Sequence, residues 1–253
     1  MDVTANQTLL SVCDAALFDL DGVLTPTAEV HMRAWSRMFN DYLAARAGDP
    51  ARGAGENLDP YTDADYFAHV DGKPRYDGVR DFLAARGIEL PEGQPSDPAG
   101  AETVCGLGNR KNAAFAAVLA TDGVAPYPGS VQLLDYLRDR GVQVAVVSSS
   151  QNAHEVLTAA RLRDRFEVLV DGRLAHAEGL PGKPAADTYR FAARELSTPV
   201  ERSVVFEDAV SGVAAGRNGG FGLVVGVDRG VGAEALLAAG ADLVVSDLAE
   251  LLP

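Results

Sequence analysis

The stretch AALFDLDGVLT, residues 15–25, decides the fold. Its first six residues are apolar apart from Asp19, which is the pattern of a strand buried on both faces of a parallel sheet. Asp19 and Asp21 stand two residues apart where this strand ends, so their side chains emerge on the same side, and Gly22 permits a tight turn. This pattern fits a carboxylate nucleophile beside a carboxylic acid/base, since aspartyl phosphates are known covalent intermediates. An ordinary Asp-Gly turn is the alternative.

Strand-like and helix-like patterns alternate through most of the chain. Further apolar runs occupy residues 142–147, 166–170, 203–206, 222–225 and 242–245. Amphipathic helix patterns lie between them, at residues 130–140, 153–161, 185–196, 210–218 and 233–239. This alternation predicts an α/β fold, a doubly wound parallel sheet of the Rossmann-like kind.

The alternation is interrupted after the first strand. Between residues 25 and 122 only helical patterns appear, at 29–46, 76–86 and 111–119, with a Gly/Pro-rich link at 91–100. We therefore predict a helical cap domain over residues 25–122, inserted into a core formed by residues 1–24 and 123–253. The wider stretch from Pro91 to Gly106 has no functional explanation in the sequence.

Composition excludes several classes of partner. The 253 residues carry a formal charge of −14, which disfavours nucleic acid and anionic membranes, because both require a basic surface. No apolar run approaches the roughly 20 residues that cross a bilayer, and the acidic N-terminus lacks the basic flank of a signal peptide. Cys13 and Cys105 are expected to be two reduced thiols. We expect a cytoplasmic monomer.

Three more groups of polar residues follow predicted strands, where open parallel sheets bind ligands. Ser148 begins a serine run whose hydroxyl and N–H groups suit a phosphate oxygen, although serines before a helix also cap it. Lys183, in PGKPAAD, either directs its ammonium at a site or is a solvated surface lysine. Glu207 and Asp208, in FEDAVSG, suit an oxygen shell for Mg²⁺, unless Asp208 only caps the next helix.

The motifs FDLDGVLT, VVSSS, GKPAAD and FEDAVSG together resemble the signature set of the haloacid dehalogenase superfamily. The resemblance implies that Asp19 is the nucleophile, Asp21 the general acid/base, and Ser148 and Lys183 phosphate binders. It further implies a Mg²⁺ site formed by Asp19, the Asp21 carbonyl, Glu207 and Asp208. The acid at position 21 indicates a phosphatase or a phosphomutase, because dehalogenating and phosphonate-cleaving relatives lack it.

Three segments of the predicted cap are similar to the beta-phosphoglucomutase family: TPTAEVHMRAW (25–35), VDGKPRYDGV (70–79) and NRKN (109–112). This resemblance implies interconversion of beta-glucose 1-phosphate and glucose 6-phosphate through a 1,6-bisphosphate. It implies that Arg75 grips the distal phosphate and that Lys111 and His31 help to place Asp21. The other implied substrate contacts are Trp35, Gly72, Ser148, Ser149, Ser150 and Asn152.

From residue type alone, His31 and Trp35 would simply pack, and Arg75 and Lys111 would be surface cations. Gln151 and Asp71 stand where the mutases usually carry lysine, and Pro26 replaces an acid.

The leading hypothesis is an isomerase acting on a small phosphorylated sugar. The alternative is a sugar-phosphate phosphatase, in which water attacks phospho-Asp19. A binding module without turnover is disfavoured, because binding needs no nucleophile paired with an acid.

Overall fold

The computed structural model describes residues 13–48 and 55–253, and the chain divides into two compact units. The first unit includes the chain up to Thr27 and resumes at Val124, whereas the second spans Ala28–Gly123. Each unit has its own cluster of buried apolar side chains.

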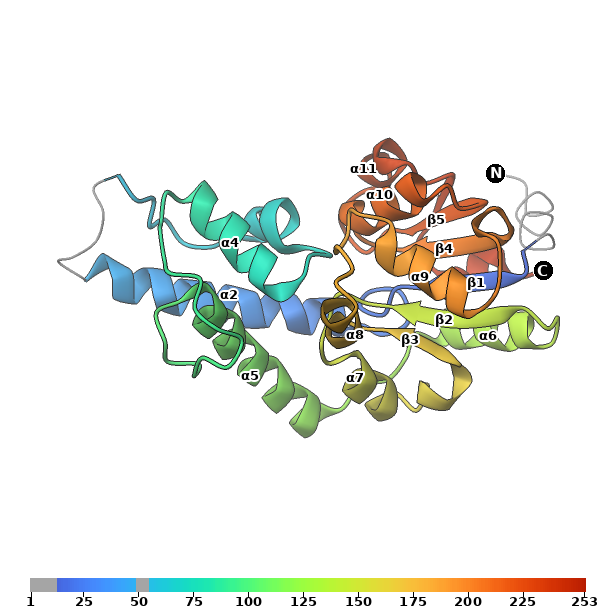
Figure 1. Ribbon diagram of the computed structural model, residues 1–253, viewed down its shortest axis with the longest axis horizontal. Helices are drawn as coiled ribbons and strands as arrows, with labels where there is room; N and C mark the ends of the chain where they lie inside the picture. Colours follow the sequence, from blue (N-terminus) through green and yellow to red (C-terminus); the bar gives the residue numbers. More distant parts are fainter. Residues whose placement is uncertain (1–12, 49–54) are drawn as a thin grey trace. The chain divides into compact units, whose positions relative to one another are not determined.

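The first unit contains six strands that pair in parallel, in the order β3-β2-β1-β4-β5-β6 (Figure 1). They are β1 (Ala15–Phe18), β2 (Gln143–Val147), β3 (Val168–Val170), β4 (Ser203–Glu207), β5 (Leu223–Val227) and β6 (Leu243–Val245). Strand β1 is interior, and its Leu17 lies opposite Ala145 of β2 and Val205 of β4. The predicted α/β fold with a parallel sheet is confirmed.

Helices connect these strands. They are α6 (Pro128–Arg138), α7 (Ala153–Ala159), α8 (Gly172–Ala177), α9 (Asp187–Glu195), α10 (Val210–Gly219) and α11 (Ala233–Ala239). Apolar side chains of α9, α10 and α11 join Leu17, Val147 and Val205 in one buried cluster, so these three helices cover one face of the sheet (Figure 1). Burial of the strands explains why their sequences are continuously apolar.

Among its described residues, the second unit contains helices joined by loops and no strand. It comprises most of α2 (Thr27–Ala47), with α3 (Asp63–Asp65), the π-helix η1 (Tyr66–Val70), α4 (Arg75–Ala85) and α5 (Val104–Asp122). Its aromatic core includes Phe39 and Phe82, whose ring centroids are 4.1 Å apart.

Helix α5 begins seven residues earlier than the predicted start at 111, which is a correction to the sequence analysis. Thr103 accounts for the difference, because its Oγ1 accepts a hydrogen bond from the N–H of Gly106 at 2.9 Å and caps the helix. Within the described chain, no helix combines the length and apolar character that crossing a bilayer would require.

Candidate active site

Three acidic residues meet at the carboxyl ends of the neighbouring strands β1 and β4. Asp19 follows β1 directly, and its N–H donates to the Phe206 carbonyl at 2.9 Å. Because Phe18 lies opposite Phe206 in register, Asp19 is brought level with Glu207, the last residue of β4. Asp208 follows, and one carboxylate oxygen from each of the three acids lies within 4.8 Å of the others.

A buried lysine lies among these acids. The Nζ atom of Lys183 is 2.6 Å from Oε1 of Glu207, forms an ion pair with Asp19, and donates to the Val147 carbonyl at 3.1 Å. Lys183 is only 4% exposed. It is therefore not the solvated surface lysine that its residue type alone would suggest.

Burial governs the protonation of this pair. It raises the pKa of Asp19 well above its ordinary value, while the Lys183 ammonium opposes the rise and the Glu207 and Asp21 carboxylates add to it. Burial alone would lower the pKa of Lys183, but the charges of Asp19 and Glu207 hold it above its usual range. Lys183 therefore remains an ammonium and offsets part of the negative charge.

Hydroxyl groups orient the second aspartate of the motif. Thr27 donates its hydroxyl to Oδ1 of Asp21, and the Oγ1 atoms of Thr25 and Thr27 are 2.8 Å apart. Gly22 adopts φ +86°, and a Cβ there would overlap the Asp208 carboxylate. The turn after Asp21 therefore requires glycine both for its backbone conformation and for space.

Tyr189 and Arg229 contact these motifs but were not found by the sequence analysis. Tyr189, on α9, is fully buried and donates its hydroxyl to Oε1 of Glu207 at 2.8 Å. Burial raises its pKa well above the usual value, so it remains a phenol and a donor. Arg229 lies in the GVDRGVG connection, and its Nε donates to the Gly22 carbonyl at 2.8 Å. Neither residue belongs to a recognisable motif.

The serine run follows β2, the other neighbour of β1. Ser148 is buried, and its Oγ accepts a hydrogen bond from the N–H of Ser150 at 3.1 Å. The Oγ of Ser150 accepts from the N–H of Asn152 at the same distance. Ser149 and Asn152 are half-buried. The loop is thus shaped by its own hydroxyls at the sheet edge that also bears Asp19.

In the helical unit, Lys111 of α5 lies in an aromatic environment. It is 4% exposed, bonds to Nδ1 of His31, and its Nζ lies 5.1 Å from the ring centroids of both Trp35 and Phe115. The rings of His31 and Phe115 stack at 4.0 Å. The structure therefore brings three of the predicted substrate contacts together, and Lys111 is not a surface cation.

The remaining predicted contacts lie around the start of α4. Gly72 adopts φ +69° in the turn before the helix, and Arg75 is the first helical residue. Nη2 of Arg75 donates to the Tyr76 hydroxyl at 3.1 Å.

The acidic cluster fits a divalent cation. Asp19, Glu207 and Asp208 supply only oxygen donors, the ligands that Mg²⁺ and Ca²⁺ prefer. Two of the three side chains are buried, and carboxylates held this close repel one another unless positive charge compensates them. Lys183 supplies one such charge, and a divalent cation would supply the rest.

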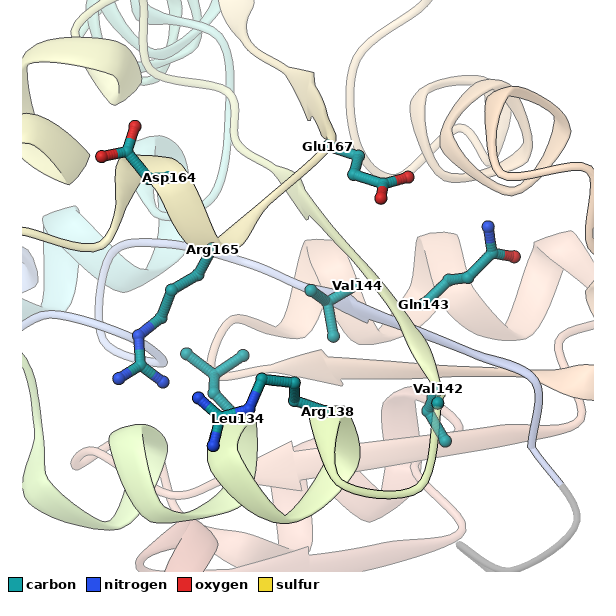
Figure 2. Close-up of a pocket in the computed structure, with 9 residues that line it drawn as sticks. Leu134, Arg138, Val142, Gln143, Val144, Asp164, Arg165 and Glu167 are labelled. Atoms are coloured by element: carbon teal, nitrogen blue, oxygen red, sulfur yellow. The ribbon is translucent and has the colours of Figure 1, made fainter.

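A cavity of about 450 Å³ lies elsewhere, by the amino ends of β2 and β3 (Figure 2). The guanidinium groups of Arg138 and Arg165 lie on one side of it, beside Leu134. Both arginines pair with Asp135, at 3.2 and 2.8 Å. Ligands of open parallel sheets bind at the carboxyl ends of the strands, so the cavity is not the candidate active site.

Comparison with known proteins agrees with this assignment. The family described as haloacid dehalogenase-like hydrolase matches residues 13–220. A protein named Beta-phosphoglucomutase from Mycobacterium bovis is 51% identical over 94% of this chain and 91% of its own length. A protein described as an uncharacterized glycosyl hydrolase from Mycobacterium tuberculosis is 42% identical over 93% of this chain, but the match covers only 17% of its own length.

Solved structures of CbbY from Rhodobacter sphaeroides are also similar. The complex with phosphate has a TM-score of 0.69 at 26% identity and covers 95% of this chain and 96% of its own. A variant complexed with xylulose-(1,5)bisphosphate has a TM-score of 0.67 at 25% identity and covers 94% and 96%. Both neighbours share the fold of this chain, and each was solved with a ligand that contains phosphate.

Proposed function

The chain belongs to the haloacid dehalogenase-like hydrolase family, and from this premise we propose that it interconverts beta-glucose 1-phosphate and glucose 6-phosphate. The observation that carries the proposal is the contact of Asp19 with the buried Lys183 ammonium, with Asp21 two residues away. A nucleophile, a compensating charge and an acid/base are what transfer through a phospho-aspartate requires.

In the first half-reaction, an Asp19 oxygen attacks the phosphorus of a bound phosphate ester. The new bond joins Asp19 to phosphorus, the bond to the sugar oxygen breaks, and Asp21 gives that oxygen a proton. In the second half-reaction, Asp21 removes a proton from a sugar hydroxyl, whose oxygen attacks the phosphorus of phospho-Asp19, and the bond between phosphorus and the Asp19 oxygen breaks. Beta-glucose 1-phosphate thereby becomes the 1,6-bisphosphate, and transfer of its 1-phosphate to Asp19 leaves glucose 6-phosphate.

Lys183 stabilises negative charge at the site. Asp19, the Asp21 carbonyl, Glu207 and Asp208 would hold a Mg²⁺ ion, which would neutralise charge on the transferring phosphoryl group. The Ser148 hydroxyl donates a hydrogen bond to a phosphate oxygen, and Lys183 keeps its positive charge because two carboxylates surround it. Thr27 keeps the Asp21 carboxylate in a defined orientation through its hydroxyl.

A mutase also needs a second phosphate site, which we assign to Arg75. A guanidinium binds phosphate in a bidentate manner, and CbbY, a structural neighbour, was solved with a bisphosphate.

The choice of a glucosyl substrate draws on the Beta-phosphoglucomutase relative. It also draws on the glycosyl hydrolase that carries a similar segment. We propose that the enzyme acts on these soluble sugars in the cytoplasm.

One observation favours a second candidate, a sugar-phosphate phosphatase. Asp71 and Gln151 provide no positive charge where lysines would support a distal phosphate, and a phosphatase needs only the first phosphate site. Water would then replace the sugar hydroxyl as the group that attacks phospho-Asp19, with Asp21 as its base.

The two functions differ in their product. The protein should be incubated with Mg²⁺, beta-glucose 1-phosphate and a trace of glucose 1,6-bisphosphate, and the phosphorus species followed by NMR. Accumulation of glucose 6-phosphate supports the mutase. Stoichiometric release of inorganic phosphate without glucose 6-phosphate would assign the protein as a phosphatase.

A further inference from the structure

Arg75 belongs to a chain of hydrogen bonds at the start of α4. Its Nη2 donates to the Tyr76 hydroxyl at 3.1 Å, and its guanidinium carbon lies 4.8 Å from the centroid of the Tyr76 ring. The same hydroxyl donates to Oδ1 of Asn109 at 2.9 Å. Tyr76 therefore links Arg75 to α5.

Asn109 continues this chain into the segment formed by residues 91–103. Its Nδ2 donates to the carbonyls of Pro95 at 3.1 Å and Asp97 at 2.9 Å. Because Nδ2 has only two hydrogens, both are used, and Oδ1 is left facing Tyr76. The neighbouring Arg110 donates through Nε to the Ala99 carbonyl at 2.8 Å. Two consecutive α5 side chains thus bind the segment.

The segment itself is tied to both helices. Asp97 Oδ2 accepts from the Thr103 hydroxyl at 2.7 Å and from the Gln94 N–H at 3.1 Å. Thr103 in turn caps α5, and Glu92 pairs with Arg80 of α4 at 2.9 Å. These contacts make residues 91–103 an ordered brace between α4 and α5 rather than a loose loop.

Gly108 brings the two helices close enough for the chain to form. A Cβ at this position would lie 2.8 Å from Cδ1 of Tyr76 and 3.2 Å from Cγ of Arg75. Real Cβ contacts essentially never approach 2.8 Å, so glycine is required for Tyr76 to pack at this point.

We propose that residues 91–103 act as a brace that positions the Arg75 guanidinium for the second phosphate, through Asn109 and Tyr76. This inference rests on the proposed function and assigns a role to the segment that the sequence left unexplained. A free arginine side chain loses rotamer entropy when it is immobilised. Holding it before the ligand arrives removes part of that loss from binding. Such preorganisation matters more here because Asp71 and Gln151 contribute no positive charge.

Two variants each remove one link of the chain. Tyr76→Phe removes the hydroxyl and keeps the ring beneath Arg75, whereas Asn109→Leu removes the amide that joins the brace. The matched control is Tyr42→Phe, in the same unit, since the Tyr42 hydroxyl is buried without a hydrogen-bond partner among the described residues. Binding of glucose 1,6-bisphosphate is measured by calorimetry with Mg²⁺ in an Asp21→Asn background, where turnover is slow. Melting temperature and hydrolysis of p-nitrophenyl phosphate are measured in the wild-type background.

We expect Tyr76→Phe and Asn109→Leu to weaken bisphosphate binding by about three- to tenfold. The control variant, and aryl phosphate hydrolysis by all three, should be nearly unchanged. In an Arg75→Ala background the loss from Tyr76→Phe should disappear, because the two residues act through one contact. The inference would be overturned if Tyr76→Phe weakened bisphosphate binding equally with and without Arg75. It would also be overturned if Tyr76→Phe and Asn109→Leu bound the bisphosphate as tightly as the Tyr42→Phe control.

The outcome is separable from that of the proposed function. A parent protein that makes no glucose 6-phosphate, yet binds the bisphosphate in a Tyr76-dependent manner, would refute the mutase and keep the brace. If the protein makes glucose 6-phosphate but Tyr76→Phe leaves its bisphosphate affinity unchanged, the proposed function stands and the brace is refuted. Absence of bisphosphate binding by the Asp21→Asn protein would refute both.

Discussion

Tyr189 donates its hydroxyl to Oε1 of Glu207 at 2.8 Å, the oxygen that also lies 2.6 Å from Lys183 Nζ. Two donors therefore hold one oxygen of a carboxylate that we propose to bind Mg²⁺. Hydrogen-bond partners of this kind orient metal ligands, and their loss weakens metal binding.

Tyr189→Phe should raise the Mg²⁺ dissociation constant about three- to tenfold, the effect of one lost hydrogen bond. The ring and its edge-on contact with Phe221 remain, so the melting temperature should change little. Isothermal titration with MgCl₂ measures the effect directly, with Tyr42→Phe as the control. A dissociation constant equal to that of the control would show that Tyr189 only fills space.

Gly22→Ala should weaken Mg²⁺ binding in addition to straining the backbone. An alanine at φ +86° is strained by about 1–2 kcal/mol, and its Cβ would also displace the Asp208 carboxylate. Gly179→Ala is the matched control, because Gly179 has φ +64° with nothing within 4 Å of its would-be Cβ. Both variants should melt at lower temperature, but only Gly22→Ala should lose Mg²⁺ affinity by tenfold or more. Equal metal affinities in the two would contradict the overlap.

Asp19→Asn should abolish turnover, because an amide does not attack phosphorus. We expect a loss of about 10³-fold or more for a nucleophile, together with no covalent incorporation of labelled phosphate. Asp139→Asn, which changes an exposed carboxylate of the same unit, should leave both measurements unchanged. If the Asp19→Asn protein still incorporated labelled phosphate, the nucleophile would be another residue.

Asp21→Asn should retain Mg²⁺ binding and lose acid/base catalysis, which contributes about 10²–10⁴-fold. The loss should depend on the leaving group. A p-nitrophenolate leaves without a proton, so phosphorylation of Asp19 by p-nitrophenyl phosphate should suffer less than phosphorylation by a sugar phosphate. Rapid-quench measurement of the phosphorylation step separates the two. Identical losses for both esters would argue that Asp21 is not the acid.

Arg75→Ala should lower the mutase rate selectively. A lost charge-assisted contact is worth roughly 1.5–3 kcal/mol, which corresponds to a tenfold to hundredfold decrease in the ratio of mutase to aryl phosphatase rates. Arg37→Ala, which changes a guanidinium of the same unit that is 81% exposed, serves as the control. Parallel losses in both activities would give Arg75 a structural role only.

The sheet could be predicted because its strands are buried on both faces. The apolar run at 15–20 contains β1 (Ala15–Phe18), and that at 203–206 contains most of β4 (Ser203–Glu207). The predicted run is longer than β1 because Leu20 stays buried in the turn beyond the strand. Hydrophobicity reports burial and not hydrogen-bond pairing, so strand ends remain the weaker part of such a prediction.

The residues that support the site could not be predicted. Tyr189 reads as an apolar position of an amphipathic helix, and only the packing of α9 on the sheet brings its hydroxyl to Glu207. The predicted helix began only at residue 111, whereas α5 already includes Gly108, where glycine is needed because Tyr76 packs against that turn of the helix. Contacts between segments far apart in the chain have no local sequence signal.

The interior position of β1 also has a consequence for protein synthesis. Its two partners are β2 and β4, and β4 ends at Glu207, 189 residues after Phe18 (207 − 18). At about 5–20 residues per second, the ribosome needs roughly 10–40 s to supply it. The contiguous unit Ala28–Gly123, which has its own apolar cluster, is complete well before then. We therefore expect the helical unit to fold first on the nascent chain, while β1 remains without its partner β4 until that strand has been synthesised.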